Sequence, residues 1–293
     1  MLGLELLDGG AVAVAVDEAG VVLGRSEVAG ADVALAASAA AEHASASSAN
    51  VVAVASLNPE SPASIAAMRK LGERFGAALV PGSALPSGTA AAVAEAWVGA
   101  ARGAKEVVYF GVAEHTSAGI LRDGLPVTGA HRRAASVAWL ALNPVEREDY
   151  RKAGCLEAEV AASGIVRRLV WRIKAGDRSR VQDAAGGDLA AVSIELVLSA
   201  ARTGDGVAIS VMRDTAKYLG MAAANLVVID DPEVLVLGGI MASAADLLLE
   251  PVRSEIARRL QGSMMQALTI VPATLGADAP AIGAARLAAA TPR

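Results

Sequence analysis

The sequence predicts an α/β protein with two related lobes, each built of a mixed sheet with flanking helices. Short strands joined by Asp/Gly turns are followed by alternating helices and strands, and this order occurs twice along the chain. The chain has 293 residues, 54% of them hydrophobic and 19% charged. At about 150 residues per domain, this length and composition suffice for two sizeable cores.

The first strands are expected within residues 2–28. Asp8-Gly9-Gly10 and Glu18-Ala19-Gly20 separate three apolar runs. They predict hairpin turns in an antiparallel meander, because glycine accepts a positive φ at no steric cost. An alanine-rich helix is expected over 31–48. The continuous apolar run NVVAVASL at 50–57 is typical of a strand covered on both faces.

A helix over 61–75, a short strand over 77–81 and a helix over 87–102 complete the first half. A second meander at 106–129, with an Asp123-Gly124 turn, begins the pattern again. The remaining elements are helices at 153–175, 188–202, 206–229, 243–260 and from about 280, and strands at 232–239 and 268–273. We therefore expect an N-terminal lobe over 1–104 and a C-terminal lobe over 105–278, with the last helix, in 279–293, packing back on the N-terminal lobe.

Composition excludes several classes of function. The 26 Lys and Arg against 31 Asp and Glu give a net charge of −5, without the basic face that nucleic acids require. One cysteine and three scattered histidines exclude a disulfide framework and a multi-cysteine metal site within one chain. The apolar stretch at 225–240 is interrupted by acidic residues, and no basic residue precedes the first apolar run. We expect a cytoplasmic protein with neither nucleic-acid nor membrane partners.

The strongest local motif is the strand ending at Gly238-Gly239 and leading into a helix. Glycines at that place allow the flat face or the phosphate of a ligand to approach the backbone, beside the positive end of the next helix. An ordinary tight turn has the same pattern, so both interpretations stay open.

In its wider setting, residues 204–253, GDGVAISVMRDTAKYLGMAAANLVVIDDPEVLVLGGIMASAADLLLEPVR, resemble the ROK family of sugar kinases and related repressors. AAAVAEAW at 90–97, SAGILRDG at 117–124, GCLEAEV at 154–160 and LGADAPAIGAARLA at 275–288 agree with this resemblance. It implies a two-lobed, actin-like ATPase fold of the ribonuclease H-like type. It also implies that Gly238 and Gly239 lie on the nucleotide side.

The sequence departs from the family at the phosphate loops. Counting back from Asp17, the family's Asp-X-Gly-Gly-Thr loop falls on residues 5–9, which read Glu-Leu-Leu-Asp-Gly. The glycine-rich second loop falls on 113–117, where the glycines are missing and Glu114 adds an acid. Carboxylates at these places would repel phosphate by about 4 kcal/mol per close pair of charges at a surface-like dielectric.

The family's general base is also replaced. Its Asn-Asp pair falls on Pro86-Ser87, and a serine hydroxyl cannot accept a proton near neutral pH as a carboxylate does. We expect Ser87 to be the N-cap of the helix that follows. No catalytic residue is therefore assigned.

The zinc and sugar motifs are reduced as well. Trp139, Glu148 and Tyr150 stand where the family has zinc ligands, which leaves Cys155 alone. Because structural zinc needs several thiolate or imidazole ligands, we expect no zinc and a Cys155 that is a small buried apolar residue. The sugar-binding Glu is replaced by Ser136.

Glu157 survives on the sugar side as a candidate substrate-binding residue. The alternative is a solvated or salt-bridged carboxylate at the start of a helix. Arg132 and Arg133 either attract an anionic ligand or are solvated or ion-paired surface residues.

These departures predict a sugar-kinase homologue that has lost phosphotransfer and binds, scaffolds or regulates. The winged-helix segment of the family's repressors is not found ahead of the first meander, and the resemblance implies a homo-oligomer. One alternative is an active kinase of a sugar or other small alcohol, using ATP and Mg²⁺ with a relocated base, Asp8, Glu114 or Glu157. Another is a module that binds a small metabolite in the interlobe cleft.

Overall fold

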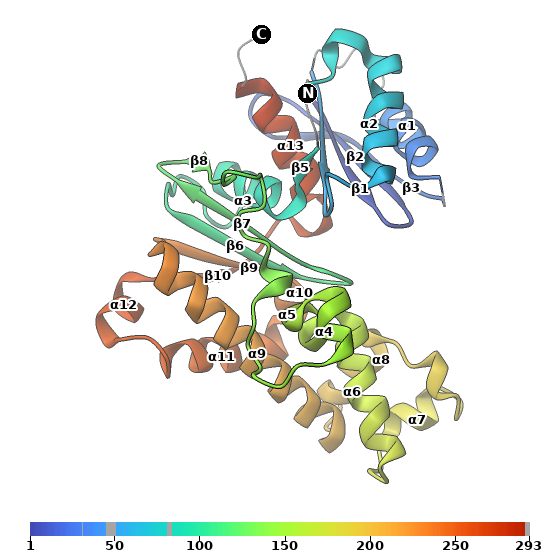
Figure 1. Ribbon diagram of the computed structural model, residues 1–293, viewed down its shortest axis with the longest axis vertical. Coiled ribbons are helices and arrows are strands. Elements are labelled where there is room, and N and C mark those ends of the chain that lie inside the picture. Colours follow the sequence, from blue (N-terminus) through green and yellow to red (C-terminus); the bar gives the residue numbers. More distant parts are fainter. Residues whose placement is uncertain (31, 45–50, 81–83, 291–293) are drawn as a thin grey trace. The chain divides into compact units, whose positions relative to one another are not determined.

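The computed structural model contains two five-stranded sheets and describes the chain except residues 31, 45–50, 81–83 and 291–293. The strand orders are β3-β2-β1-β4-β5 and β8-β7-β6-β9-β10 (Figure 1). When the five strands of each sheet are counted in chain order, they take the same places in both sheets. Strand β1 pairs antiparallel with β2 and parallel with β4. The prediction of two mixed sheets built by a repeated pattern is confirmed.

The strands are β1 Leu2–Leu7, β2 Gly10–Val16, β3 Val22–Ala29, β4 Val52–Ser56, β5 Leu85–Pro86, β6 Val107–Val112, β7 Thr116–Arg122, β8 Leu125–Pro126, β9 Val234–Gly239 and β10 Thr269–Pro272. The helices are α1 Val33–Ala44, α2 Pro62–Phe75, α3 Ser87–Trp97, α4 Glu148–Ala153, α5 Cys155–Val160, α6 Ala162–Lys174, α7 Arg180–Ala184, α8 Ile194–Arg202, α9 Gly206–Asp230, α10 Ile240–Ser243, α11 Ala245–Ala257, α12 Gly262–Ala267 and α13 Ala279–Ala290. The helix expected over 31–48 is α1, and its predicted positions 31 and 45–48 lie outside the described residues.

The three predicted turns form, for partly different reasons. Asp123 and Gly124 both adopt positive φ, 51° and 75°, and Gly20 has φ 85°, as expected for tight turns that favour glycine. The two-residue turn between β1 and β2 brings Leu7 opposite Gly10, but neither Asp8 nor Gly9 has a positive φ. The expectation of a glycine with positive φ was therefore wrong for that first turn.

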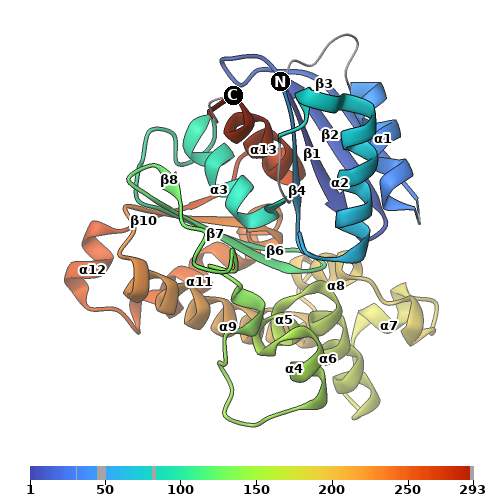
Figure 2. The ribbon, with the colours of Figure 1, turned by 45° about the horizontal axis from the view of Figure 1, so that its top comes forward.

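The first sheet is covered on both faces by helices, α1 and α2 on one side and α3 and α13 on the other (Figures 1 and 2). Leu4, Leu6 and Val54 belong to the core under α1 and α2. The alternate residues of β4, Ala53 and Ala55, pack against α3 and α13. This arrangement explains the continuous apolar run of β4, because neither face of the strand meets water.

Small residues allow α3 and α13 to approach closely. A Cβ added at Gly283 of α13 would lie 1.7 Å from the carbonyl oxygen of Ala90 on α3, and a Cβ at Gly3 of β1 would lie 1.8 Å from the carbonyl oxygen of Ala281. Much of the alanine and glycine content of these segments thus serves helix packing as well as helix propensity.

Several predicted boundaries were wrong. The expected strand at 77–81 is instead a 3-10 turn, Gly76–Ala78, followed by a single bridge from Leu79 to Val52, and position 81 is not described. Helix α3 ends at Trp97 rather than 102, because the chain folds back so that the amide of Ala100 reaches the Glu95 carboxylate. The helix expected over 153–175 is interrupted at Ala161, whose extended backbone separates α5 from α6. Helix α12 was not predicted.

The chain divides into two compact units: Met1–Tyr109, Ala118–Ala135 and Ala273–Arg293 form the first, and Phe110–Ser117 and Ser136–Pro272 form the second. In the second unit, α9 packs against α5, α6, α8 and α11. Asp205 caps α9 by accepting a hydrogen bond from Ala208 N at 2.8 Å. None of the helices in the described ranges has the length and hydropathy needed to cross a membrane.

Candidate functional site

Glu5 and Ser87 form a buried polar pair in the first unit. Glu5 lies in the middle of β1, where Leu4 and Leu6 face the core under α1 and α2. Because side chains alternate along a strand, Glu5 faces the side covered by α3, where Ser87 is the first helical residue. The two residues are 7% and 3% exposed. The residues that the resemblance assigns to the first phosphate loop and to the position of the general base are therefore neighbours.

Burial raises the pKa of the Glu5 carboxyl to about 7. The Ser87 hydroxyl partly opposes this increase by lowering the pKa, and the negative charge of Asp278 adds to it. Desolvation disfavours the charged form of an acid, and no cation is among the groups that shift this pKa. Glu5 thus titrates near neutral pH, where it can either hold or accept a proton.

The expected N-cap role of Ser87 is wrong. Helix α3 has Pro86 at the N-cap position, with no side-chain cap hydrogen bond, so Ser87 already has helical geometry and its side chain faces inward. Its Oγ is buried and has no hydrogen-bond partner of good geometry within the described part of the chain. The interaction with Glu5 is therefore weak, and the pKa of Glu5 stays high.

The other candidate bases lie in different surroundings. Asp8 and Glu114 are exposed, Asp8 at the turn between β1 and β2 and Glu114 at the turn between β6 and β7. Neither side chain is removed from water by the surrounding protein. Of the three carboxylates proposed from the sequence, Glu157 is the one held in a partly buried network.

Glu157 lies on α5 and binds the turn between β6 and β7. Its Oε2 accepts hydrogen bonds from Thr116 N at 2.8 Å and Thr116 Oγ1 at 3.1 Å. His115 Nδ1 lies 3.1 Å from Glu157 Oε1. Burial alone would raise the pKa of Glu157, but these contacts with His115 and Thr116 outweigh it and lower the pKa. Both carboxylate oxygens are engaged, and the role of Glu157 in binding a substrate stays a prediction.

Replacing Glu157 by Gln is expected to destabilise the fold by about 1–2 kcal/mol at pH 7, because an amide cannot accept from both Thr116 donors and His115. Since the pKa of Glu157 is lowered on folding, its contribution is complete above the ordinary value of 4.5 and is lost as the pH falls through the folded pKa. Urea unfolding at pH 7 and at about pH 3.5 measures both effects. The exposed Glu114→Gln is the control, and equal losses for the two variants would contradict this role.

Gly239 ends β9 with φ 61°, and a Cβ there would lie 1.9 Å from the carbonyl oxygen of Val112 in β6. A close approach between neighbouring strands is therefore enough to require glycine at this position. Gly238 precedes it in the strand and is buried. Their assignment to the nucleotide side stays a prediction.

The positions that the resemblance assigns to a zinc site have the following contacts. Tyr150 is buried with Cys155 and Ala158, and its hydroxyl donates to Glu159. Glu148 pairs with Lys152 at 2.7 Å, and Trp139 is 60% exposed. Cys155 is a buried free cysteine, as predicted. Across the described ranges, no three His, Cys, Asp or Glu side chains are grouped as a metal site.

The two arginines considered as anion attractors differ. Arg133 pairs with Glu60 at 2.6 Å on the surface of the first unit, as in the ion-paired alternative. Arg132 is exposed and has a φ of 57°. Ser136 is exposed.

The burial of several acids was missed in the sequence, Glu5 and Glu159 among them. Glu5 could have been found, because an acid within an apolar strand covered on both faces must be buried. Glu159, with Arg147 and Arg168, joins α5, α6 and the segment before α4. These three residues lie on separate elements, and no local pattern indicates that they meet.

A family model described as the ROK family matches residues 31–291. The chain belongs to the ROK family. It is 32% identical over 198 residues to a glucokinase of Halalkalibacterium halodurans, covering 66% of this chain and 59% of that protein. It is 34% identical over 238 residues to the bifunctional enzyme NanE/NanK of Brucella melitensis, covering 80% of this chain and 40% of that protein. The DNA-binding regulator NagC of Escherichia coli is 28% identical to this chain over 164 residues, covering 56% of this chain and 39% of that protein. The ROK chain thus spans about two fifths to three fifths of the length of these relatives.

Solved structures support the same fold. A ROK family glucokinase from Streptomyces griseus, in complex with glucose and AMPPNP, superposes with a TM-score of 0.85 at 24% identity, covering 99% of both chains. A ROK family transcriptional regulator, a homologue of the E. coli MLC protein, superposes with a TM-score of 0.81 at 21% identity, covering 98% of this chain and 78% of that one. The two-lobed, actin-like fold expected from the resemblance is confirmed. Enzymes and regulators both have this fold, so the fold alone does not decide between them.

Proposed function

We propose that this ROK protein binds a hexose or a related small polyol without phosphorylating it, and acts as a binding or regulatory protein. The observation that carries the proposal is the Glu5–Ser87 pair. Ser87 supplies a hydroxyl where relatives are expected to have the carboxylate base, and Glu5 is a buried acid with a pKa of about 7 in the first phosphate segment. Neither residue is suited to stabilise the charge of a transferring phosphate.

The second phosphate segment supports the same proposal. The amide of Thr116, a backbone donor that could bind a phosphate oxygen, donates to the Glu157 carboxylate at 2.8 Å. The exposed Glu114 adds negative charge to this turn. The residues present do not fit a nucleoside triphosphate with its Mg²⁺ ion, because negative groups stand where anionic oxygens need donors. We propose no zinc for the corresponding reason of ligand chemistry.

The decisive experiment measures ADP release with Mg-ATP and a panel of hexoses, N-acetylhexosamines and small polyols. We expect a rate at the background of the assay, whereas a typical enzyme turns over about 1–1000 times per second. Thermal-shift screening of the same sugars without nucleotide is expected to raise the melting temperature with at least one of them. ADP release at an ordinary enzymatic rate would overturn the proposal.

One observation favours a second candidate, an active sugar kinase. A carboxyl with a pKa of about 7 is well matched to a general base at neutral pH, and Glu5 has such a pKa beside the position of the family's base. In that case Glu5→Gln abolishes ADP release while the protein stays folded. The control Glu18→Gln, an exposed acid of the same unit, leaves the rate unchanged.

We do not extend DNA binding to this chain. The match to NagC covers 39% of that regulator, and a net charge of −5 gives no support to phosphate binding along a duplex. A homo-oligomer is proposed from the resemblance, and light scattering after size exclusion measures it.

A further inference from the structure

A cavity of about 810 Å³ lies in the second unit. Its walls come from the 142–147 segment, α5, α6, α9 and the residues after α11. The lining residues are Leu142, Asn143, Arg147, Glu159, Arg167, Arg168, Trp171, Asp214, Lys217, Tyr218, Met221 and Arg259. The volume is within the range of pockets that hold small organic molecules, about 300–1000 Å³.

The cavity has an excess of positive charge. Five cationic and four acidic side chains line the cavity or pair with those that do. The cations are Arg147, Arg167, Arg168, Lys217 and Arg259, and the acids are Asp149, Glu159, Asp214 and Glu255. The excess of one positive charge contrasts with the negative net charge of the whole chain. An anion entering the cavity is therefore attracted.

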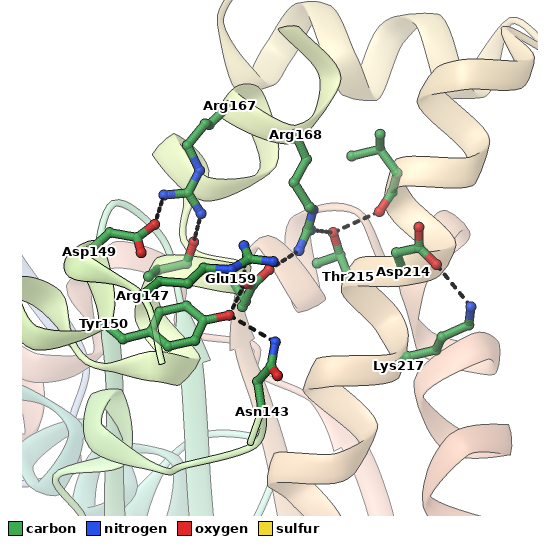
Figure 3. Close-up of polar contacts among 12 residues, drawn as sticks. Asn143, Arg147, Asp149, Tyr150, Glu159, Arg167, Arg168, Asp214, Thr215 and Lys217 are labelled. Carbon is green, nitrogen blue, oxygen red and sulfur yellow. Dashed lines mark hydrogen bonds and ion pairs between the residues drawn. The ribbon is translucent and has the colours of Figure 1, made fainter. Parts of the chain in front are cut away.

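Glu159, one of the lining residues, has a side chain that is 2% exposed. Figure 3 shows the polar contacts around it. Glu159 accepts from Arg147 at 3.2 Å, from Arg168 at 3.0 Å and from the Tyr150 hydroxyl. Two guanidinium groups thus share one carboxylate. Arg168 also donates to Thr215, but its Nε is buried and unpartnered within the described residues.

The rim supplies further donors that water can reach. Arg167 donates to the carbonyl oxygen of Ala158 at 2.7 Å and pairs with Asp149, and Lys217 pairs with Asp214 at 2.9 Å. The Arg167 and Lys217 side chains are 43% and 57% exposed. Exposed ion pairs of this kind contribute little to stability, so these cations can turn toward a ligand at small cost.

An apolar wall accompanies the charges. Trp171 on α6 lines the cavity and is 69% exposed. Leu142 and Met221 also line it, and the ring of Tyr218 lies 5.9 Å from the Arg168 guanidinium carbon. A purely inorganic anion would leave these surfaces in contact with water, whereas the body of an organic ligand would cover them.

We propose that this cavity binds a small organic phosphate, a phosphomonoester dianion with a compact polar body. The positive charge of the lining attracts the dianion. The exposed charged donors of Arg167 and Lys217 match phosphate oxygens, and a guanidinium group can bind such oxygens through two hydrogen bonds. Trp171 and Leu142 cover the organic part.

The probe is glucose 6-phosphate, titrated by calorimetry and by tryptophan fluorescence, with glucose and inorganic phosphate as comparison ligands. We expect saturable binding of glucose 6-phosphate that weakens as salt is added, and binding of glucose and of inorganic phosphate at least about tenfold weaker. The fluorescence change is expected to disappear in Trp171→Phe, while the calorimetric binding persists in weakened form.

The double variant Arg167→Gln/Lys217→Gln changes only exposed rim residues and is expected to weaken binding by about tenfold or more. Lys174→Gln, on the exposed surface of α6 and outside the cavity lining, is the matched control and should bind as the unmodified protein does. Unchanged binding by the double variant overturns the proposal. So do equal affinities for glucose 6-phosphate and inorganic phosphate, and so does self-association through Trp171 without anion binding. Phosphotransfer is not measured in any arm, so failure here leaves the proposed function standing.

Discussion

Replacement of Glu95 by Gln is expected to lower the free energy of unfolding by about 3 kcal/mol, the largest effect of a single substitution that we predict. Glu95 lies on α3 and is 0% exposed. Its Oε1 accepts from Thr274 N and Leu275 N, both at 3.0 Å, and its Oε2 accepts from Ala100 N at 2.7 Å and Thr274 Oγ1 at 3.2 Å.

These four donors come from two segments that are far apart in the sequence. Ala100 follows α3, and Thr274 and Leu275 precede α13. One buried carboxylate thus binds both the segment that follows α3 and the segment that precedes α13. In the Glu95→Gln variant the NH₂ group of the new amide would face backbone N–H groups, so at least one donor would stay buried without an acceptor.

Differential scanning calorimetry measures the effect, and about 3 kcal/mol corresponds to a fall in melting temperature of roughly 6–12 °C for a domain of 150–250 residues. Glu73→Gln, an exposed acid of α2 in the same unit, is the control and should stay within about 1 °C, because exposed substitutions seldom alter stability by more than about 0.5 kcal/mol. A change in Glu95→Gln as small as that of the control would contradict the structural role.

The second large effect is a stabilisation that depends on pH. Because the pKa of Glu5 is raised from 4.5 to about 7 in the folded protein, folding favours the protonated acid. Stability from this group is therefore complete below pH 4.5 and is lost as the pH rises through 7. At about pH 8, Glu5→Gln is expected to stabilise the protein by up to about 3 kcal/mol, since one pKa unit corresponds to about 1.4 kcal/mol.

At pH 4.5 the two proteins should be nearly equal in stability, because Gln resembles the protonated acid in size and polarity. Urea unfolding at half-unit intervals from about pH 4.5 to 8.5 gives the difference directly. Glu18→Gln is exposed and should show no such pH dependence. A constant difference across the range would mean that Glu5 ionises as an ordinary acid and that its burial has no energetic consequence.

Much of the fold followed from local patterns. The apolar run of β4 indicated a strand covered on both faces, and the structure has helices on both sides of it. Gly20 and Asp123-Gly124 indicated turns that do adopt positive φ. The expected strand at 77–81 failed, because pairing with Val52 depends on a neighbour distant in sequence, and Leu79 makes a single bridge.

The candidate site was less accessible to sequence reasoning. The positions of Ser87 and Glu157 came from the resemblance, but their partners did not. Ser87 was expected to cap α3 and instead lies inside the helix beside Glu5. The contact of Glu157 with Thr116 joins residues 41 positions apart, and hydrogen bonds of that kind depend on how α5 docks against the sheet.

The amino-acid sequence by itself determined the type and order of most elements, the repeated strand pattern and the residue types available for chemistry, because periodicity and turn preference act over a few residues. The tertiary structure alone decided which charges lose water and which meet a partner. Glu5, Glu95 and Glu159 are the same kind of residue, yet one has a pKa of about 7, one binds four donors and one is shared by two arginines. Their difference arises from burial and from neighbours brought together across the chain, and electrostatic energies depend on both.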